Sequence, residues 1–332
     1  MKTRHLLAAS SERPGLSRRA VLQGSLGLAS LALVPPANAE SAADPHVWGG
    51  MTQEELDRAY SQGPWAPNWS EIWERYSENS ERARKRLGEP RQLRFGETPD
   101  ETLDLYPADG SNLPVHIFVH GGAWFTGDSR RHGFLAETFV NAGAHFIAVN
   151  YSSVDDTGGS LLPLADQVRR AVRWVFMNAD SFGADKQRIH ISDHSSGAHL
   201  AAVAMTTDWQ GQFNLPQDII KGGLLCSGMY DLEPVSLLDR REYVRFDRET
   251  VEDLSPQRHL DYLAAPIIVT YGTLESPEFQ RQSRDFSTAV NKQGKDVNLI
   301  AAENYNHFEI IETLANPYGL LGFPALQQMG LA

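Results

Sequence analysis

Residues Ile191–Ala202 read ISDHSSGAHLAA, and this stretch decides how the chain is interpreted. An apolar strand end is followed by a turn centred on Ser195, and small residues then begin a helix. This order is typical of a nucleophile elbow, a sharp strand-to-helix turn of the pattern Gly-x-Ser-x-Gly that exposes a serine hydroxyl. Gly197 fits the pattern, because the turn is too tight there for a side chain. Ser195 is therefore the candidate nucleophile.

Asp193 occupies the position of the first glycine of that pattern. Its side chain stands where the turn normally has none, so we expect backbone strain of about 1–3 kcal/mol. We also expect its negative charge to stabilise a nearby imidazolium and so to raise the pKa of the base. Neither effect removes the Ser195 hydroxyl. The substitution nevertheless leaves a second hypothesis open, a non-catalytic or impaired ligand-binding protein on a hydrolase-like scaffold.

The segments on both sides of the elbow alternate between strands and helices. An amphipathic helix is predicted over 161–180, with Leu164, Val168, Ala171, Val172 and Val175 on one stripe. The apolar runs typical of buried strands are LPVHIFVHGG (113–122), HFIAVNY (145–151), IKGGLLCSG (220–228) and PIIVTYG (266–272). This alternation predicts an α/β fold with a mainly parallel central sheet and helices on both faces.

We predict that residues 40–332 form a single domain around this sheet. Residues 51–88 read as helices, with a capping box at Thr52 and Glu55 and a stop signal at Gly88. Residues 231–263 are polar, charged and irregular, and they interrupt the strand and helix pattern. We interpret this second segment as a cap-like insertion over the site.

The first 39 residues have the features of an export signal. Paired arginines, Arg18 and Arg19, precede an apolar run of about 15 residues, and Ala37-Asn38-Ala39 supplies a small-x-small cleavage site. The arginine pair is typical of the twin-arginine type. A retained membrane anchor is the alternative, but the run is shorter than the roughly 20 residues that span a bilayer. We expect a cleaved signal, no stable membrane insertion afterwards, and a periplasmic or secreted protein.

Composition excludes several classes of partner. The formal net charge of −12 argues against a nucleic-acid or anionic-membrane partner, which would require a basic face. Cys226 is the only cysteine of the 332 residues, so neither an intramolecular disulfide nor a cysteine-based zinc site can form. His116 and His120 lie four apart on a predicted strand without an acidic partner. We therefore expect no metal and no cofactor.

The HGGAW segment, His120–Trp124, follows a buried strand at the place of an oxyanion loop. Gly121 permits the turn, and Gly122 and Ala123 are the candidate N–H donors. The N–H group of Ser196, directly after the nucleophile, is the third candidate donor. Four parts are needed for acyl transfer by a serine: the hydroxyl, a base, an acid that orients the base, and these donors.

The acid and the base follow in the required order along the chain. Glu275 is the first acidic residue after PIIVTYG and is our candidate acid, with Glu278 as second choice. Asp231, after IKGGLLCSG, is a topological alternative. His307, in NYNHFEI, is the candidate base among eleven histidines, because it alone lies after the next strand and before the last helix. His194 flanks the elbow and is expected to serve packing or hydrogen bonding, as is His199.

The segments HGGAW, SSGAHLAA, CSGMYDLEPV, ESPEFQRQS and NHF together resemble the bacterial kynurenine formamidase (arylformamidase) branch of the α/β-hydrolases, near the hormone-sensitive-lipase-like esterases. The resemblance runs from about Met51 to the C-terminus. It implies Ser195 as nucleophile, Glu275 as acid, His307 as base and the HGGAW backbone as oxyanion hole.

Two departures limit what the resemblance implies about the substrate. Asp193 replaces the elbow glycine, and an export signal is unexpected for an enzyme whose substrate is made in the cytoplasm. The sequence therefore predicts a serine hydrolase that cleaves a carboxylic ester or an aryl amide or formamide through an acyl-enzyme. Trp124 and Tyr230 are candidate walls of the pocket, together with the 231–263 insertion.

Overall fold

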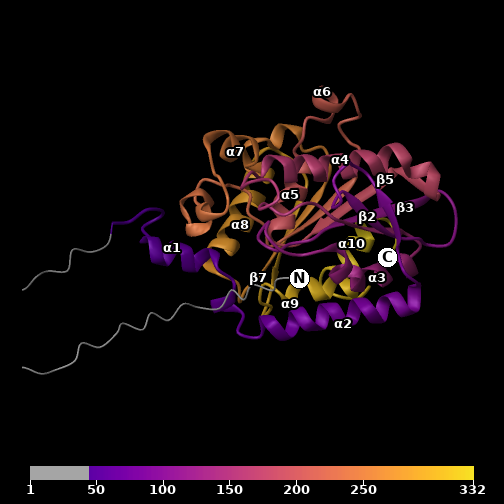
Figure 1. Ribbon diagram of the computed structural model, residues 1–332, viewed down its shortest axis with the longest axis horizontal. Helices are drawn as coiled ribbons and strands as arrows, with labels where there is room; N and C mark the ends of the chain where they lie inside the picture. Colours follow the sequence, from indigo (N-terminus) through magenta and orange to yellow (C-terminus); the bar gives the residue numbers. More distant parts are fainter. Residues whose placement is uncertain (1–44) are drawn as a thin grey trace, which may run out of the picture. The chain divides into compact units, whose positions relative to one another are not determined.

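An eight-stranded sheet forms the centre of the computed structural model, which describes residues 45–332 (Figure 1). The strand order is β1-β2-β4-β3-β5-β6-β7-β8. Strand β2 is antiparallel to both of its neighbours, whereas all other neighbouring pairs are parallel. The strands are β1 (Arg91–Arg94), β2 (Thr102–Tyr106), β3 (Leu113–Val119), β4 (His145–Val149), β5 (Ala184–Asp193), β6 (Gly222–Cys226), β7 (Ile267–Gly272) and β8 (Val297–Ala302). The predicted mainly parallel sheet is confirmed.

Helices cover both faces of this sheet, as predicted. Along β3, Val115, Ile117 and Val119 belong to one core cluster, whereas Phe118 belongs to the other. Successive side chains of a strand point to opposite faces, so this alternation identifies two separate cores. Strands buried on both faces become continuously apolar, which explains the runs seen in the sequence.

The first core lies under α4 (Leu162–Asn178), α5 (Ser196–Met205) and α8 (Pro277–Lys292), which Figure 1 shows above the sheet. All five residues of the predicted α4 stripe are buried there. The second core lies under α2 (Trp69–Leu87), α3 (Ala136–Asn141), α9 (Glu309–Glu312) and α10 (Gly322–Gln328), on the opposite side. Two further short helices are α6 (Trp209–Phe213) and α7 (Arg248–Asp253).

Two N-terminal helices lie within the segment predicted to be helical. Helix α1 (Gln53–Tyr60) begins with both hydrogen bonds of the predicted capping box between Thr52 and Glu55. Helix α2 ends at Gly88, whose φ of 89° is a left-handed value that favours glycine. The predicted export signal over 1–39 lies outside the described residues.

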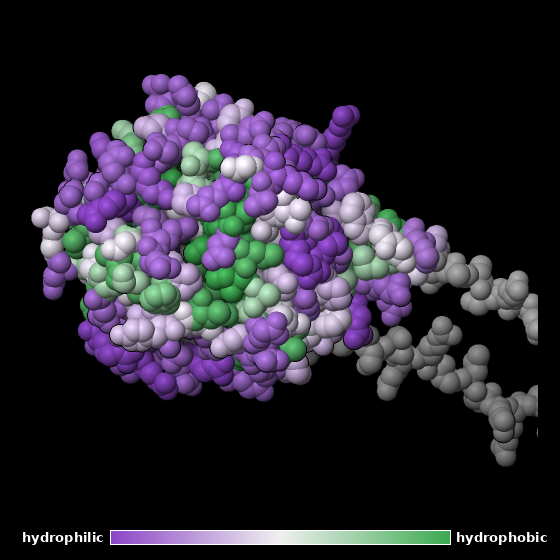
Figure 2. Space-filling model, turned by 180° about the vertical axis from the view of Figure 1, so that it is seen from behind, coloured by the Kyte–Doolittle hydropathy of each residue, from purple (hydrophilic) through white to green (hydrophobic). Residues whose placement is uncertain are grey.

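One face of the described surface combines hydrophilic and apolar areas. Figure 2 shows one face on which hydrophilic residues surround a central apolar hollow. Within residues 45–332, every helix is too short or too polar to cross a membrane.

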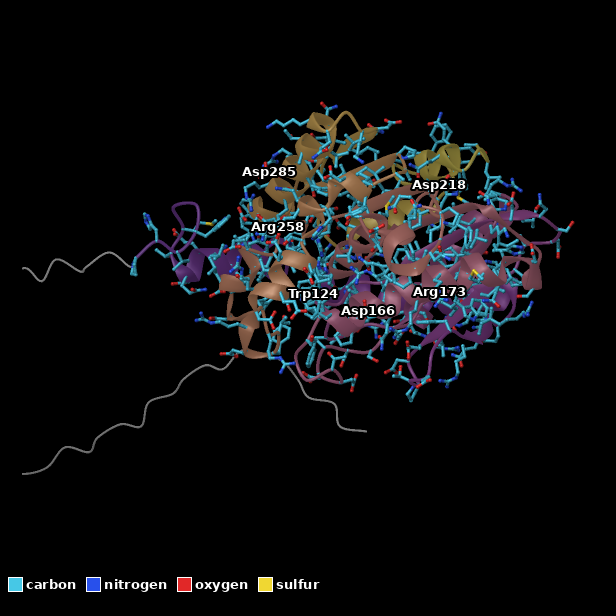
Figure 3. All side chains as sticks on the ribbon, turned by 90° about the horizontal axis from the view of Figure 1, so that it is seen from above. Trp124, Asp166, Arg173, Asp218, Arg258 and Asp285 are labelled. Atoms are coloured by element: carbon cyan, nitrogen blue, oxygen red, sulfur yellow. The ribbon has the colours of Figure 1, made fainter. Side chains whose placement is uncertain are left out.

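The insertion over 231–263 consists of short helical turns and includes α7. Its aromatic side chains pack on the HGGAW segment and its neighbour. The ring centroids of Phe246 and Trp124 lie 6.3 Å apart, and those of Tyr243 and Phe125 lie 5.8 Å apart. Figure 3 labels one residue of each segment, Trp124 and Arg258. The insertion thus contacts the loop that carries the candidate oxyanion donors.

Candidate active site

Ser195 lies in a sharp turn between β5 and α5. Its φ of 59° and ψ of −123° are unusual for a residue with a side chain, as expected for a nucleophile elbow. The residue is partly exposed, and its hydroxyl does not cap the helix that follows. A Cβ on Gly197 would stand 2.3 Å from the carbonyl oxygen of Val119 and 2.4 Å from that of His120. The predicted need for glycine at this position is confirmed.

Asp193 differs from expectation in two respects. It is the last residue of β5, and the left-handed backbone occurs at Ser195 instead. Its carboxyl group is fully buried, and burial raises its pKa well above the usual range. Burial thus disfavours the charged form of Asp193, in contrast to the negative charge that the sequence analysis expected.

The Asp193 carboxyl has one hydrogen-bond partner in the described part of the chain. Oδ1 accepts a 2.8 Å hydrogen bond from the Cys226 N–H group, whereas Oδ2 has no partner. The N–H group of Ser195 donates to the Cys226 carbonyl oxygen over 2.9 Å. Asp193 and Ser195 therefore bind the N–H group and the carbonyl oxygen, respectively, of Cys226 at the end of β6.

Glu275 and His307 are brought together by the loops after β7 and β8. The Nδ1–H group of His307 donates to Oε2 of Glu275 over 2.9 Å. Both side chains are buried. The imidazole ring of His307 also packs against the ring of His194, the residue before Ser195, with centroids 4.6 Å apart. The structure thus places the hydrogen-bonded pair of Glu275 and His307 next to the elbow.

The two other candidate acids point elsewhere. Glu278 accepts hydrogen bonds from Tyr60 and Arg281. Asp231 faces Arg258, whose Nη2 lies 3.4 Å from Oδ1. Neither carboxylate is a partner of the histidine.

Two histidines beside the elbow serve hydrogen bonding, as predicted. Nε2 of His194 lies 2.7 Å from the His307 carbonyl oxygen and so contacts the backbone of the candidate base. Nδ1 of His199 accepts from the Trp124 indole over 3.1 Å. Burial lowers the pKa of both rings, so both are neutral near pH 7.

The predicted oxyanion loop lies against the elbow. A Cβ on Gly121 would stand 3.0 Å from the Ser195 Cβ, so only glycine permits this approach. Within the described residues, the N–H groups of Gly122 and Ala123 have no backbone acceptor. The N–H group of Ser196 is the first of α5, and the first donors of a helix have no partner inside it. Within the described residues, all three candidate donors thus have no backbone acceptor.

The two candidate pocket residues are both buried. Trp124 contributes its backbone N–H to Ser196 Oγ over 3.1 Å and lies within the loop itself. Tyr230 stacks on Phe286, with centroids 4.2 Å apart, and belongs to the apolar core. Its contacts describe packing, and its place in a pocket wall stays a prediction.

The sequence analysis missed Ser227. Its hydroxyl donates to Oε1 of Glu275 over 2.6 Å, and the Gly272 N–H group donates to the same oxygen over 2.6 Å. Ser227 has a left-handed φ of 56° directly after β6. A serine after a strand carries no signal by itself, because the hydrogen bond depends on how β6 and β7 lie in the sheet.

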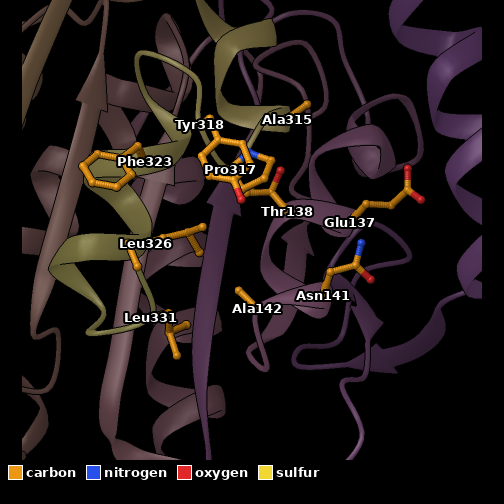
Figure 4. Close-up of a pocket in the computed structure, with 11 residues that line it drawn as sticks. Glu137, Thr138, Asn141, Ala142, Ala315, Pro317, Tyr318, Phe323, Leu326 and Leu331 are labelled. Carbon is orange, nitrogen blue, oxygen red and sulfur yellow. The ribbon is translucent and has the colours of Figure 1, made fainter.

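The described residues also contain a cavity of about 530 Å³ between α3, the loop before α10 and the C-terminus. Figure 4 shows its lining, which includes Thr138, Tyr318 and Phe323 but none of the candidate site residues. No group of three or more His, Cys, Asp or Glu within 45–332 is arranged to hold a metal ion.

Comparison with known proteins agrees with this fold. The family model BD-FAE matches residues 103–221. A kynurenine formamidase from Danio rerio is 32% identical over 296 residues, which are 85% of this chain and 98% of that protein. Esterase LipC from Mycobacterium tuberculosis is 29% identical over 220 residues, which are 59% of this chain and 53% of that protein. A crystal structure from Silicibacter sp. TM1040 matches with a TM-score of 0.70 at 24% identity, covering 82% of this chain and 98% of that one.

The fold and these relatives define the protein as an α/β-hydrolase, an enzyme related to hormone-sensitive-lipase-like esterases. Within that class, the chain belongs to the kynurenine formamidase family. The resemblance seen in the sequence is thereby confirmed.

Proposed function

We propose that this hydrolase cleaves its substrate through an acyl-enzyme on Ser195, with His307 as base and Glu275 as the acid that orients it. One observation carries the proposal: the imidazole of His307 is bound to Glu275 on one side and packs against His194, next to Ser195, on the other. The Nδ1–H bond to the carboxylate leaves Nε2 unprotonated in the neutral ring, as a general base requires.

In this mechanism His307 takes the Ser195 proton while Oγ attacks the carbonyl carbon of the substrate. The N–H groups of Gly122, Ala123 and Ser196 stabilise the oxyanion of the tetrahedral intermediate. His307 then gives the proton to the leaving alcohol or amine, and the acyl-enzyme forms. Water, activated by the same imidazole, releases the acid and restores the Ser195 hydroxyl. No step requires a cofactor.

The proposed substrate is a small carboxylic ester or an aryl amide or formamide. The names of the relatives support both chemistries, since one is a kynurenine formamidase and another an esterase. The edge-on contact of the Trp124 and Phe246 rings supports a pocket wall made by the loop and the insertion. The twin-arginine pattern of residues 1–39 supports action in the periplasm or outside the cell.

A second candidate function is ligand binding without turnover. The buried and partly unpaired carboxyl group of Asp193, within the elbow itself, is the observation that favours it.

Labelling of the mature protein with a fluorophosphonate probe distinguishes the two candidates. The proposal predicts a stoichiometric adduct, mapped by mass spectrometry to Ser195, and no adduct on the Ser195→Ala variant. A folded protein that takes up no probe would support the binding function instead. Turnover of N-formylkynurenine and of short p-nitrophenyl esters then ranks formamide against ester. Cleavage of the formamide alone would overturn the broader esterase assignment.

A further inference from the structure

Two consecutive residues of the oxyanion loop have a left-handed backbone without being glycine. The φ angles are 55° at Ala123 and 61° at Trp124. Such conformations cost on the order of 1–3 kcal/mol each and persist only where neighbouring contacts hold them. The contacts that hold this loop therefore decide where its N–H groups point.

Trp124 is attached at two points to the helix that begins at the nucleophile. Its backbone N–H donates to Ser196 Oγ over 3.1 Å, and its indole Nε1–H donates to His199 Nδ1 over 3.1 Å. Ser196 and His199 are three residues apart on α5, so both face the loop. The tryptophan thus ties the loop to the element that positions Ser195.

The second ring nitrogen of His199 forms a hydrogen bond with the insertion. Nε2 lies 2.7 Å from the carbonyl oxygen of Leu254, directly after α7. An indole can only donate and a carbonyl can only accept, so the ring is neutral with its proton on Nε2. Burial lowers the pKa of His199 to about 4, in agreement with this state. The His199 ring also packs edge-on against the Trp124 ring, with centroids 5.3 Å apart and an angle of 89° between the ring planes.

We propose that His199 is a positioning residue of the oxyanion hole. By accepting from Trp124 and donating to Leu254, it fixes the indole between α5 and the insertion, and so fixes the Gly122 and Ala123 N–H groups relative to Ser195. The inference rests on the proposed function, because it assigns a task to the same oxyanion hole. Since those donors act mainly in the transition state, a loss of position lowers kcat more than it changes KM.

Three substitutions separate the two hydrogen bonds of His199. Trp124→Phe keeps a ring but removes the indole donor. His199→Gln places an amide near Nε2 and loses the acceptor for Trp124. His199→Asn places its amide near Nδ1, which keeps that acceptor and loses the bond to Leu254. His190→Gln is the matched control, because His190 is also a buried histidine, on β5 and outside the site.

The proposal predicts that Trp124→Phe and His199→Gln each lower kcat by about 10-fold or more, with KM within about twofold of wild type. The double variant is no slower than the worse single variant, because both changes remove one interaction. His199→Asn retains most of kcat, and His190→Gln lowers stability without lowering kcat.

The proposal is overturned by any of three results in folded protein: wild-type kcat in His199→Gln, multiplied losses in the double variant, or equal losses in His199→Asn and His199→Gln. The indole N–H resonance of Trp124, assigned by its loss in Trp124→Phe, reports the hydrogen bond without turnover. It shifts in His199→Gln and is retained in His199→Asn if the bond exists as proposed. Absence of Ser195 labelling in the wild type contradicts the proposed function itself, whereas a labelled wild type with an unshifted resonance contradicts only the role of His199.

Discussion

Oε2 of Glu275 lies 2.9 Å from Nδ1 of His307, while the other oxygen of the same carboxylate accepts from Ser227 and from the Gly272 backbone. The carboxylate is only 1% exposed, and a buried charge is tolerated only where donors surround it. Three donors meet this need: Ser227 directly after β6, Gly272 at the end of β7, and His307 after β8. Glu275 is thus held by several elements of the sheet rather than by its own loop alone.

Replacing Ser227 by Ala is expected to lower kcat about 10-fold, because a hydrogen bond to a charged group contributes about 1.5–3 kcal/mol. Oε1 of the carboxylate would lose one of its two donors, Ser227 and the Gly272 N–H group, and Glu275 would orient His307 less well. Steady-state kinetics on a p-nitrophenyl ester measures the effect.

Ser227→Gly is the matched control for this prediction. Glycine relieves the left-handed φ at this position and also lacks the hydroxyl. If the hydroxyl is responsible, both variants lose activity. Recovery of wild-type kcat in Ser227→Gly would assign the loss to backbone strain and contradict the prediction.

Replacing Asp193 tests what the aspartate contributes at the elbow position where the usual pattern has glycine. Asp193→Asn keeps an acceptor for the Cys226 N–H group and is expected to leave stability within about 1 kcal/mol of wild type. Asp193→Gly leaves that buried donor unpaired, at a cost of about 1–3 kcal/mol. Urea unfolding measures both changes.

Activity of the same Asp193 variants separates the two candidate functions. Under the proposed mechanism, Asp193→Gly retains activity or shifts its pH profile, because the hydroxyl and its partners are unchanged. A large gain from a baseline near zero would instead show that Asp193 disables the natural site.

Much of the fold was predictable because it depends on local patterns. Buried strands are continuously apolar, and the order of loop, serine, acid and histidine follows from the chain path. Gly197 was predictable for the same reason, since the tight turn itself requires glycine.

The electrostatic state of the site was not predictable in this way. The raised pKa of Asp193 follows from its complete burial at the end of β5, which the sequence does not reveal. Ser227 and Glu275 are 48 residues apart, and Trp124 and His199 are 75 apart. Such pairs meet only once the sheet has formed, so no spacing rule reveals them.

Replacing Gly197 by Ala is expected to destabilise the protein strongly. The added Cβ would overlap two backbone carbonyl oxygens, at 2.3 and 2.4 Å, and backbone atoms of β3 and its loop cannot move aside cheaply. We expect a loss of about 3 kcal/mol or more, or insoluble protein.

Gly63→Ala is the matched control, because a Cβ there meets nothing within 4 Å. Its unfolding midpoint in urea should equal that of the wild type. A Gly197→Ala protein with an unchanged midpoint and full activity would show that the elbow relaxes, against the geometry described here.

Stability is expected to fall as the pH drops from about 6.5 towards 4, because several buried histidines stay neutral in the fold. Burial lowers the pKa of His132 to about 3 and of His190 and His199 to about 4, from an ordinary value of 6.5. Below pH 6.5 the unfolded chain binds protons at these residues that the folded chain does not bind. Each such histidine therefore removes up to about 1.4 kcal/mol of unfolding free energy per pH unit within this window.

Urea unfolding at pH 8, 7, 6 and 5 measures this slope, and His190→Gln provides its internal test. Between pH 6 and 5, the unfolding free energy of the variant should fall by less than that of the wild type. The difference should be up to about 1.4 kcal/mol, because the unfolded variant binds one proton fewer. Between pH 8 and 7 the two proteins should show equally small changes, because these histidines are neutral in both states there. Equal changes in the wild type and in His190→Gln between pH 6 and 5 would mean that the buried His190 ring takes up a proton without unfolding. The comparison with the variant is needed because the raised pKa of buried Asp193 stabilises the fold towards low pH and offsets part of the histidine effect.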